Sequence, residues 1–178
     1  MVTPIGLGCW QFSKQKTMAG KFWPALEDNL TERIVSLSID GGINWFDTAE
    51  AYGGGESEKA LSKALKAAGK KPGEVIVATK LWPVFRFASN IRKTINKRIR
   101  LLDPYAIDLY QVHQPWSLSG ENCEMAVMAE LVNRKLIKAI GVSNFNAQKM
   151  ENSWETLQKS GIPLATNQVR YSLLDRRI

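Results

Sequence analysis

The chain has 178 residues, 44% of them hydrophobic, and a formal net charge of +7. This length and composition fit one globular domain and exclude a disordered chain. The N-terminus lacks a signal-peptide pattern, no apolar run is long enough to span a membrane, and the two cysteines match no metal or redox spacing. We therefore expect a cytoplasmic protein with no membrane segment and no metal site.

Short apolar runs alternate with helical patterns from the N-terminus onward. An apolar run at 5–10 is followed by a helical pattern at 31–42, with Thr31 as its N-cap and glycines at its end. A strand is predicted at 43–49, and an amphipathic helix at 57–69. Three glycines separate these last two elements.

The alternation continues to the C-terminus. Residues 74–82 are rich in β-branched side chains and predict a buried strand. The remaining predicted elements are helices at 88–103, 121–138 and 146–161 and strands at 106–115, 139–145 and 163–172. Six strands and five helices in strict alternation indicate a parallel sheet, because each return crossover needs a helix. A doubly wound open sheet and a barrel both satisfy this pattern, but "GLGCWQ" lacks the third glycine of a dinucleotide fingerprint.

The predicted helix at 88–103 contains the basic stretch "RKTINKRIR". Apolar residues recur in it at helical spacing, at Ile91, Ile95, Ile99 and Leu102. This spacing predicts a helix whose basic residues form a solvated face. A nucleic-acid surface is the alternative, but no aromatic residues interleave and no known binding motif is present, so we expect no nucleic-acid partner. A phosphate-bearing small ligand would also suit a basic protein.

Polar side chains stand at the ends of successive predicted strands. Lys80 lies 33 residues after Asp47 and 33 residues before His113, so one strand–helix unit separates each pair. The later strands carry Ser143, Asn144 and Gln168. The C-terminal ends of parallel strands share one face, which is where α/β barrels keep their active sites. We therefore expect these residues to gather around one site.

Tyr52 follows Asp47 by five residues and suggests a proton-transfer role. A nearby Lys80 cation favours the phenolate and would lower the pKa of the phenol. Tyr52 and His113 could together polarise a carbonyl oxygen and deliver a proton to it. The set contains no activated nucleophile and no metal cage, so a carbonyl reduction would need a hydride-bearing cofactor.

Six segments resemble, in order, the signature segments of the aldo-keto reductases. They are "GLGCWQF", "GGINWFDTAEAYGGGESE", "VIVATK", "IDLYQVHQP", "IGVSNF" and "NQVRYSLL", and they run from residue 5 to about residue 175. The variants "GLGCW" and "LYQVHQPW" are similar to the potassium-channel β-subunit and bacterial branches. The resemblance implies an α/β protein with a (β/α)8 TIM barrel that reduces aldehydes or ketones to alcohols with NADPH.

The resemblance also implies roles for individual residues. The catalytic tetrad would be Asp47, Tyr52, Lys80 and His113, with Tyr52 as the proton donor. The NADP-binding residues would be Trp10, Asp47, Ser143, Asn144 and Gln168. Trp82 and Trp116 would line the pocket for a small carbonyl substrate. The long segment 12–30 would either cover the substrate or form a passive insertion.

A complete barrel of this kind has eight strands and about 250 residues, so residues 1–178 would be the N-terminal portion of a single reductase domain. By resemblance, the remainder would supply an aromatic residue that stacks on the nicotinamide and a basic loop for the 2′-phosphate. Three explanations stay open: a fragment of a longer reductase, completion or self-association through open sheet edges, and a shortened product that binds a nucleotide or partner without turnover. We expect the 178-residue chain alone to bind NADPH weakly.

Overall fold

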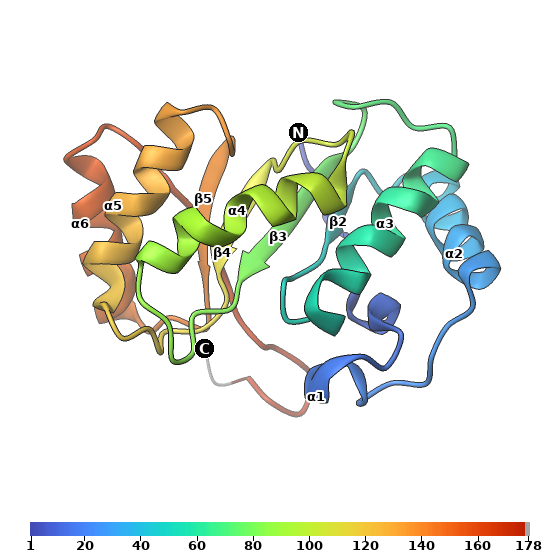
Figure 1. Ribbon diagram of the computed structural model, residues 1–178, viewed down its shortest axis with the longest axis horizontal. Coiled ribbons are helices and arrows are strands. Elements are labelled where there is room, and N and C mark those ends of the chain that lie inside the picture. Colours follow the sequence, from blue (N-terminus) through green and yellow to red (C-terminus); the bar gives the residue numbers. More distant parts are fainter. Residues whose placement is uncertain (177–178) are drawn as a thin grey trace. The chain divides into compact units, whose positions relative to one another are not determined.

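The computed structural model of the protein describes residues 1–176 and, apart from positions 19 and 20, their side chains (Figure 1). The chain forms two compact units. Unit 1 contains Met1–Lys80 and Ile95–Asp108, and unit 2 contains Leu81–Thr94 and the chain from Leu109 onward. The chain therefore passes between the units three times.

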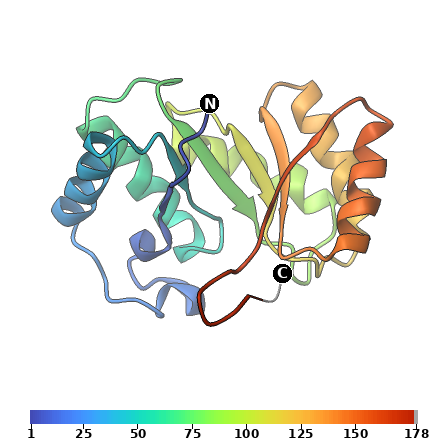
Figure 2. The same cartoon turned by 180° about the vertical axis from the view of Figure 1, so that it is seen from behind.

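Unit 1 is built on three parallel strands in chain order: β1 (Leu7–Gly8), β2 (Trp45–Asp47) and β3 (Ile76–Leu81), whose last residue already belongs to unit 2. Two helices, α2 (Asp28–Asp40) and α3 (Glu56–Ala67), lie side by side in this unit (Figure 1). Three short helical segments, η1 (Trp10–Ser13), α1 (Thr17–Gly20) and η2 (Gly53–Gly55), lie in the loops that follow β1 and β2. Figure 2 shows the chain start, in dark blue, beside β2.

The core of unit 1 forms because the apolar positions of its strands and helices face one another. Phe46 pairs with Val77 across β2 and β3, and both side chains are fully buried. Leu61 and Leu65, one helical turn apart on α3, are also fully buried. This core fixes β2 and β3 in register, and that register positions the polar residues at their C-terminal ends.

Unit 2 repeats the arrangement with β4 (Leu109–Val112), β5 (Ala139–Ser143) and β6 (Leu164–Gln168), again parallel and in chain order. The helices α5 (Gly120–Asn133) and α6 (Ala147–Gln158) pack together in it (Figure 1). Helix α4 (Ser89–Leu102) begins in unit 2 and ends in unit 1. Asn146 caps α6 by accepting a hydrogen bond from the Lys149 backbone nitrogen at 2.9 Å.

Each of the six predicted strands and five predicted helices has a counterpart in the structure, but α2 begins at Asp28, so Thr31 lies inside that helix and is not its N-cap. The first strand is shorter than predicted, because the chain turns into the 3₁₀ helix η1 at Trp10. Segment 12–30 also contains the short helix α1, which the sequence pattern did not indicate. Among residues 1–176, no helix combines the length and the apolar character that crossing a bilayer requires.

Candidate functional site

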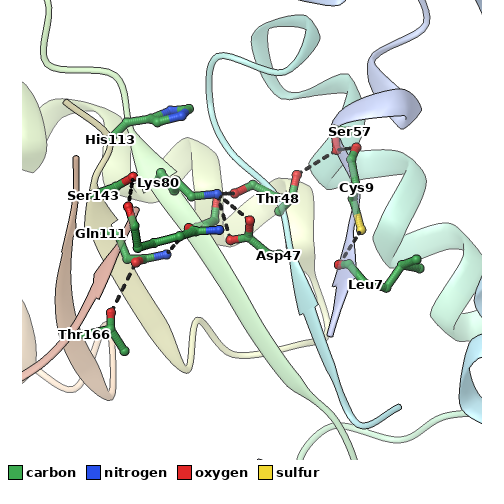
Figure 3. A network of polar contacts seen from close by, with 12 residues as sticks. Leu7, Cys9, Asp47, Thr48, Ser57, Lys80, Gln111, His113, Ser143 and Thr166 are labelled. Atoms are coloured by element: carbon green, nitrogen blue, oxygen red, sulfur yellow. Dashed lines mark hydrogen bonds and ion pairs between the residues drawn. The ribbon is translucent and has the colours of Figure 1, made fainter. Parts of the chain in front are cut away.

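A buried ion pair joins the ends of β2 and β3 in unit 1. Nζ of Lys80 lies 2.7 Å from Oδ1 and 2.6 Å from Oδ2 of Asp47, and it also donates to the Thr48 carbonyl oxygen at 3.1 Å (Figure 3). The register explains the pairing, because Asp47 lies opposite Ala78 and side chains two apart on a strand share a face. Lys80 is 1% exposed and Asp47 7%, so the lysine charge has a fixed partner inside the protein.

The phenol of Tyr52 lies beside this pair. Nζ of Lys80 is 5.2 Å from the centre of the Tyr52 ring, and the Trp10 ring stacks on Tyr52 at 5.7 Å with an interplanar angle of 18°. Burial, followed by the Asp47 charge, raises the pKa of Tyr52 above its ordinary value of 10. The expectation that Lys80 would lower this pKa is therefore wrong, because Asp47 balances the lysine charge and desolvation prevails. Tyr52 stays a protonated donor at neutral pH.

Hydrogen bonds fix the loop that carries Tyr52. The Thr48 and Ser57 hydroxyls lie 2.7 Å apart, and Ser57 Oγ donates to the Cys9 carbonyl oxygen at 2.6 Å (Figure 3). The Ser57 backbone nitrogen donates to the Tyr52 carbonyl oxygen at 3.2 Å. Gly53 follows Tyr52 with φ of +71°, and a Cβ there would collide with the Ser13 carbonyl oxygen. The glycine run thus lets the loop turn tightly against η1.

Segment 12–30 contacts the Trp10 ring that stacks on Tyr52. The Phe22 and Trp23 rings lie 5.6 and 5.8 Å from the Trp10 ring, the second in an edge-on arrangement. Phe22 is 76% exposed, so its ring is available to a ligand. Sequence reasoning named Trp10 but missed Phe22 and Trp23, because a segment without periodicity does not reveal which of its aromatic residues pack inward.

His113 follows β4 in unit 2. Its ring meets Trp82 edge-on at 5.4 Å, and its carbonyl oxygen accepts a hydrogen bond from Nδ2 of Asn144 at 3.2 Å. Trp116, in the loop after His113, is 59% exposed. Asp47, Tyr52, Lys80 and Trp10 thus lie together in unit 1, whereas His113 and the two other predicted tryptophans belong to unit 2.

A cluster of hydroxyl and amide groups lies at the ends of β5 and β6. Ser143 Oγ and the Asn144 backbone nitrogen both donate to the Gln168 carbonyl oxygen, at 2.8 and 3.0 Å. Gln111 donates to the Gln168 side chain at 3.3 Å, and Thr166 donates to Gln111 at 3.2 Å (Figure 3). Gln111 and Thr166 were not predicted as site residues. In the predicted strand 106–115 Gln111 lies two residues before His113 and therefore on the same face, which is the signal that could have found it.

The amide cluster adjoins a cavity of about 880 Å³ in unit 2. Its lining includes Asn144, Asn146, Asn167 and Arg170, and Asn144 is exposed to solvent. A nicotinamide carboxamide needs both donors and acceptors, which hydroxyl and amide side chains provide, and a phosphate needs a cation such as Arg170. The amide groups and Arg170 therefore suit a pyridine nucleotide, whereas the carboxylate of Asp175 in the same lining does not favour a phosphate beside it.

Two other kinds of chemistry lack support in the described residues. Burial, followed by the Asp47 charge, raises the pKa of the Cys9 thiol, so Cys9 is not a ready thiolate nucleophile. Within residues 1–176, no cluster of three His, Cys, Asp or Glu side chains is placed to hold a metal ion.

One basic residue of α4 corrects the expectation of a solvated basic face. Arg98 is fully buried, and its Nη1 lies 2.8 Å from Oε2 of Glu58, which is also fully buried. Thr79 donates to Oε1 of Glu58 at 2.6 Å. Burial raises the pKa of Glu58, although the Arg98 charge acts in the opposite direction. Arg98 is spaced from Ile91, Ile95 and Leu102 so that all four lie on one helix face. This spacing could have predicted the burial of Arg98.

Comparison with known proteins gives the family. The model of the aldo/keto reductase family matches residues 4–178. Among curated relatives, the aldo-keto reductase YhdN of Bacillus subtilis is 35% identical over 98% of this chain, and a chloroplastic pyridoxal reductase of Arabidopsis thaliana is 31% identical over 97%. The matches cover 51% and 50% of those two proteins, so the chain spans about half the length of the curated relatives.

Solved structures give the same result for the fold. A thermostable aldo-keto reductase in complex with the inhibitor epalrestat matches with a TM-score of 0.80 and 30% identity, over 96% of this chain and 58% of that one. An aldo-keto reductase from Klebsiella pneumoniae in complex with NADPH matches with a TM-score of 0.78 and 26% identity, over 96% and 55%. The predicted (β/α)8-barrel fold class is confirmed, with six of its strands in the part of the chain that the structure describes. The chain belongs to the aldo/keto reductase family.

Proposed function

We propose that the chain reduces aldehydes or ketones to alcohols with NADPH and that Tyr52 is the proton donor. The observation that carries this proposal is the buried Lys80–Asp47 pair beside the Tyr52 ring. A phenol kept protonated by burial can give its proton to a carbonyl oxygen once negative charge develops there. The Lys80 ammonium then stabilises the phenolate that remains, and Asp47 keeps that ammonium in place.

Unit 2 supplies the remaining roles in this proposal. Ser143, Asn144 and Gln168 would hold the nicotinamide carboxamide, and bound NADPH would supply the hydride that reduces the carbonyl carbon. His113 would donate a hydrogen bond to the substrate oxygen. Its edge-on contact with Trp82 and its link to Asn144 support a fixed position for this histidine within the unit.

The substrate class that we propose is a small carbonyl compound with apolar surface. Each unit offers aromatic surface of its own: in unit 1 Trp10 stacks on Tyr52, and in unit 2 Trp82 lies against His113 and Trp116 is exposed. Two relatives are named for carbonyl compounds: the pyridoxal reductase of A. thaliana and a methylglyoxal reductase of Yersinia pestis, which is 29% identical over 99% of this chain. Both cysteines are free, which fits the cytoplasmic setting that we propose.

We further propose that residues 1–178 are the N-terminal portion of a single reductase domain, because the family model spans both units without interruption and the chain covers about half of its relatives. β1 in unit 1 and β6 in unit 2 would be the strands through which a second copy or a completing chain pairs.

A second candidate function is binding of a pyridine nucleotide without turnover. The amide cluster and the adjoining cavity of unit 2 favour it, because they can contact a nucleotide without the residues of unit 1.

Product analysis separates the two functions. The purified chain is incubated with NADPH and 4-nitrobenzaldehyde, and both the loss of NADPH absorbance and the alcohol formed are measured. Reductase activity predicts one alcohol for each NADPH consumed, and no consumption without aldehyde. The binding function predicts a saturable change of NADPH fluorescence with no alcohol. If neither alcohol nor a fluorescence change appears at any NADPH concentration, both proposed functions are contradicted.

A further inference from the structure

Two neighbouring residues of β3 hold the two ends of the Tyr52 loop in unit 1. Successive side chains on a strand point to opposite faces, so Thr79 and Lys80 reach different partners. Lys80 contacts Asp47, five residues before Tyr52, and Thr79 donates at 2.6 Å to Glu58, six residues after it. The loop that carries Tyr52 is therefore attached to one strand at its start and at its end.

Arg98 fixes the Glu58 end of this attachment. Its Nη1 lies 2.8 Å from Glu58, and both side chains are fully buried. None of the three guanidinium nitrogens of Arg98 makes a hydrogen bond of good geometry among residues 1–176, so the short ion pair with Glu58 is an electrostatic contact. An arginine keeps its charge in proteins, so Glu58 cannot move away without leaving that charge unpaired in the core.

The end of the glycine turn also rests directly on α4. Gly55 has φ of +108°, and a Cβ at this position would lie 2.5 Å from Leu101 Cδ1 and 3.3 Å from Nη2 of Arg98. Lys97 donates from Nζ to the Gly54 carbonyl oxygen at 3.4 Å. The turn after Tyr52 thus contacts the same helix that supplies Arg98.

We propose that Glu58, held by Thr79 and Arg98, is a positioning residue that sets where the Tyr52 ring lies relative to Lys80. Glu58 touches neither the reacting atoms nor the cofactor cluster, and it acts through the loop. The catalytic meaning of this placement rests on the proposed role of Tyr52 as proton donor. The position of the Tyr52 ring can be tested without that role, because it is measured from the ring signals themselves.

The test removes one hydroxyl. Thr79→Val keeps the size of the side chain but removes the hydroxyl that donates to Glu58, and Thr79→Ser restores that hydroxyl. Thr31→Val is the matched control, because Thr31 is also buried in unit 1 and donates only within its own helix turn, to the Glu27 carbonyl oxygen. The chain is labelled with ¹³C on its four tyrosine rings, and the Tyr52 signals are assigned with Tyr52→Phe.

Stacking on Trp10 makes the Tyr52 ring signals sensitive to small displacements. Thr79→Val is expected to shift the Tyr52 signals and leave those of exposed Tyr171 unchanged. Thr79→Ser and Thr31→Val are expected to keep the wild-type Tyr52 signals. Unchanged Tyr52 signals in folded Thr79→Val would overturn the proposal. A Thr79→Val chain that does not fold would also count against it, because that outcome assigns the hydroxyl to global stability.

Turnover in the product assay gives a second readout. Thr79→Val is expected to lower kcat about 10- to 100-fold with little change in KM, because misplacing a catalytic group by about 1 Å costs that much. Absence of turnover in the wild-type chain would refute the proposed reductase function, whereas the ring signals would still decide the positioning role.

Discussion

The loss of stability should depend on which partner of the buried Glu58–Arg98 pair is removed. Both side chains are fully buried and lie 2.8 Å apart. In Glu58→Gln the guanidinium remains charged in the core, because arginine does not lose its proton in proteins. Breaking a buried ion pair in this way costs about 3–5 kcal/mol of unfolding free energy.

The reverse substitution should cost less at neutral pH. In Arg98→Met the carboxyl of Glu58 can take up a proton, because burial raises its pKa and the Arg98 charge that opposes this rise is gone. The remaining cost is that of an imperfectly satisfied neutral carboxyl, about 1–3 kcal/mol. This cost should grow as the pH rises above 7, because a buried carboxyl without its partner resists ionisation.

The double variant E58Q/R98M completes the cycle. It removes both charges, keeps an amide oxygen for Thr79 and keeps most of the volume, so its stability should lie within about 1 kcal/mol of wild type. Urea unfolding at pH 7 and pH 9, followed by tryptophan fluorescence, measures all four proteins with a common m value. A Glu58→Gln cost equal to or below that of Arg98→Met at pH 7, or simple additivity in the double variant, would refute the reasoning.

Three further outcomes are expected. Gly55→Ala should destabilise the chain by about 1–3 kcal/mol in urea unfolding, because its Cβ would lie 2.5 Å from Leu101 Cδ1. Gly73→Ala, also at positive φ but in open space, should cost less, and equal losses would show that contact with α4 is irrelevant. Burial raises the pKa of Glu124 from 4.5 to about 7, so this carboxyl stabilises the fold at low pH and loses that contribution as pH rises through 7. Between pH 5 and pH 8 the unfolding free energy of Glu124→Gln should therefore fall by about 2 kcal/mol less than that of wild type. An unchanged pH profile would show that Glu124 is solvated. NADPH should bind the 178-residue chain weakly in a fluorescence titration, because the contacts assigned to the cofactor are few. Asn144→Ala should weaken this binding further. Tight binding that Asn144→Ala does not change would place the nucleotide elsewhere.

The sequence predicts the order of the elements well because each signal is local. Strict alternation of apolar runs and helical patterns places every strand and long helix, and the ends of the strands identify Asp47 and Lys80 as partners. The pairing follows from strand register alone, since parallel neighbours carry equivalent positions to the same edge.

What the sequence does not predict depends on competition between burial and charge. The basic run around Arg98 reads as a solvated face, yet its position on the apolar stripe of α4 takes Arg98 into the core with Glu58. The pKa of Tyr52 rises where a neighbouring lysine suggests a fall, because proximity of a cation says nothing about how completely another residue balances it. The contacts of Phe22 and Trp23 with Trp10 come from an aperiodic segment, in which packing is set by tertiary structure.

The role of Tyr52 is tested most directly by removing its hydroxyl. NADPH-dependent reduction of 4-nitrobenzaldehyde is measured for wild type, Tyr52→Phe and, as a control, Tyr171→Phe, whose side chain is 59% exposed. Loss of the proton donor should lower kcat by about 100-fold or more in Tyr52→Phe, with the unfolding free energy little changed and the control at the wild-type rate. Wild-type turnover in Tyr52→Phe would contradict the assignment of Tyr52 as proton donor.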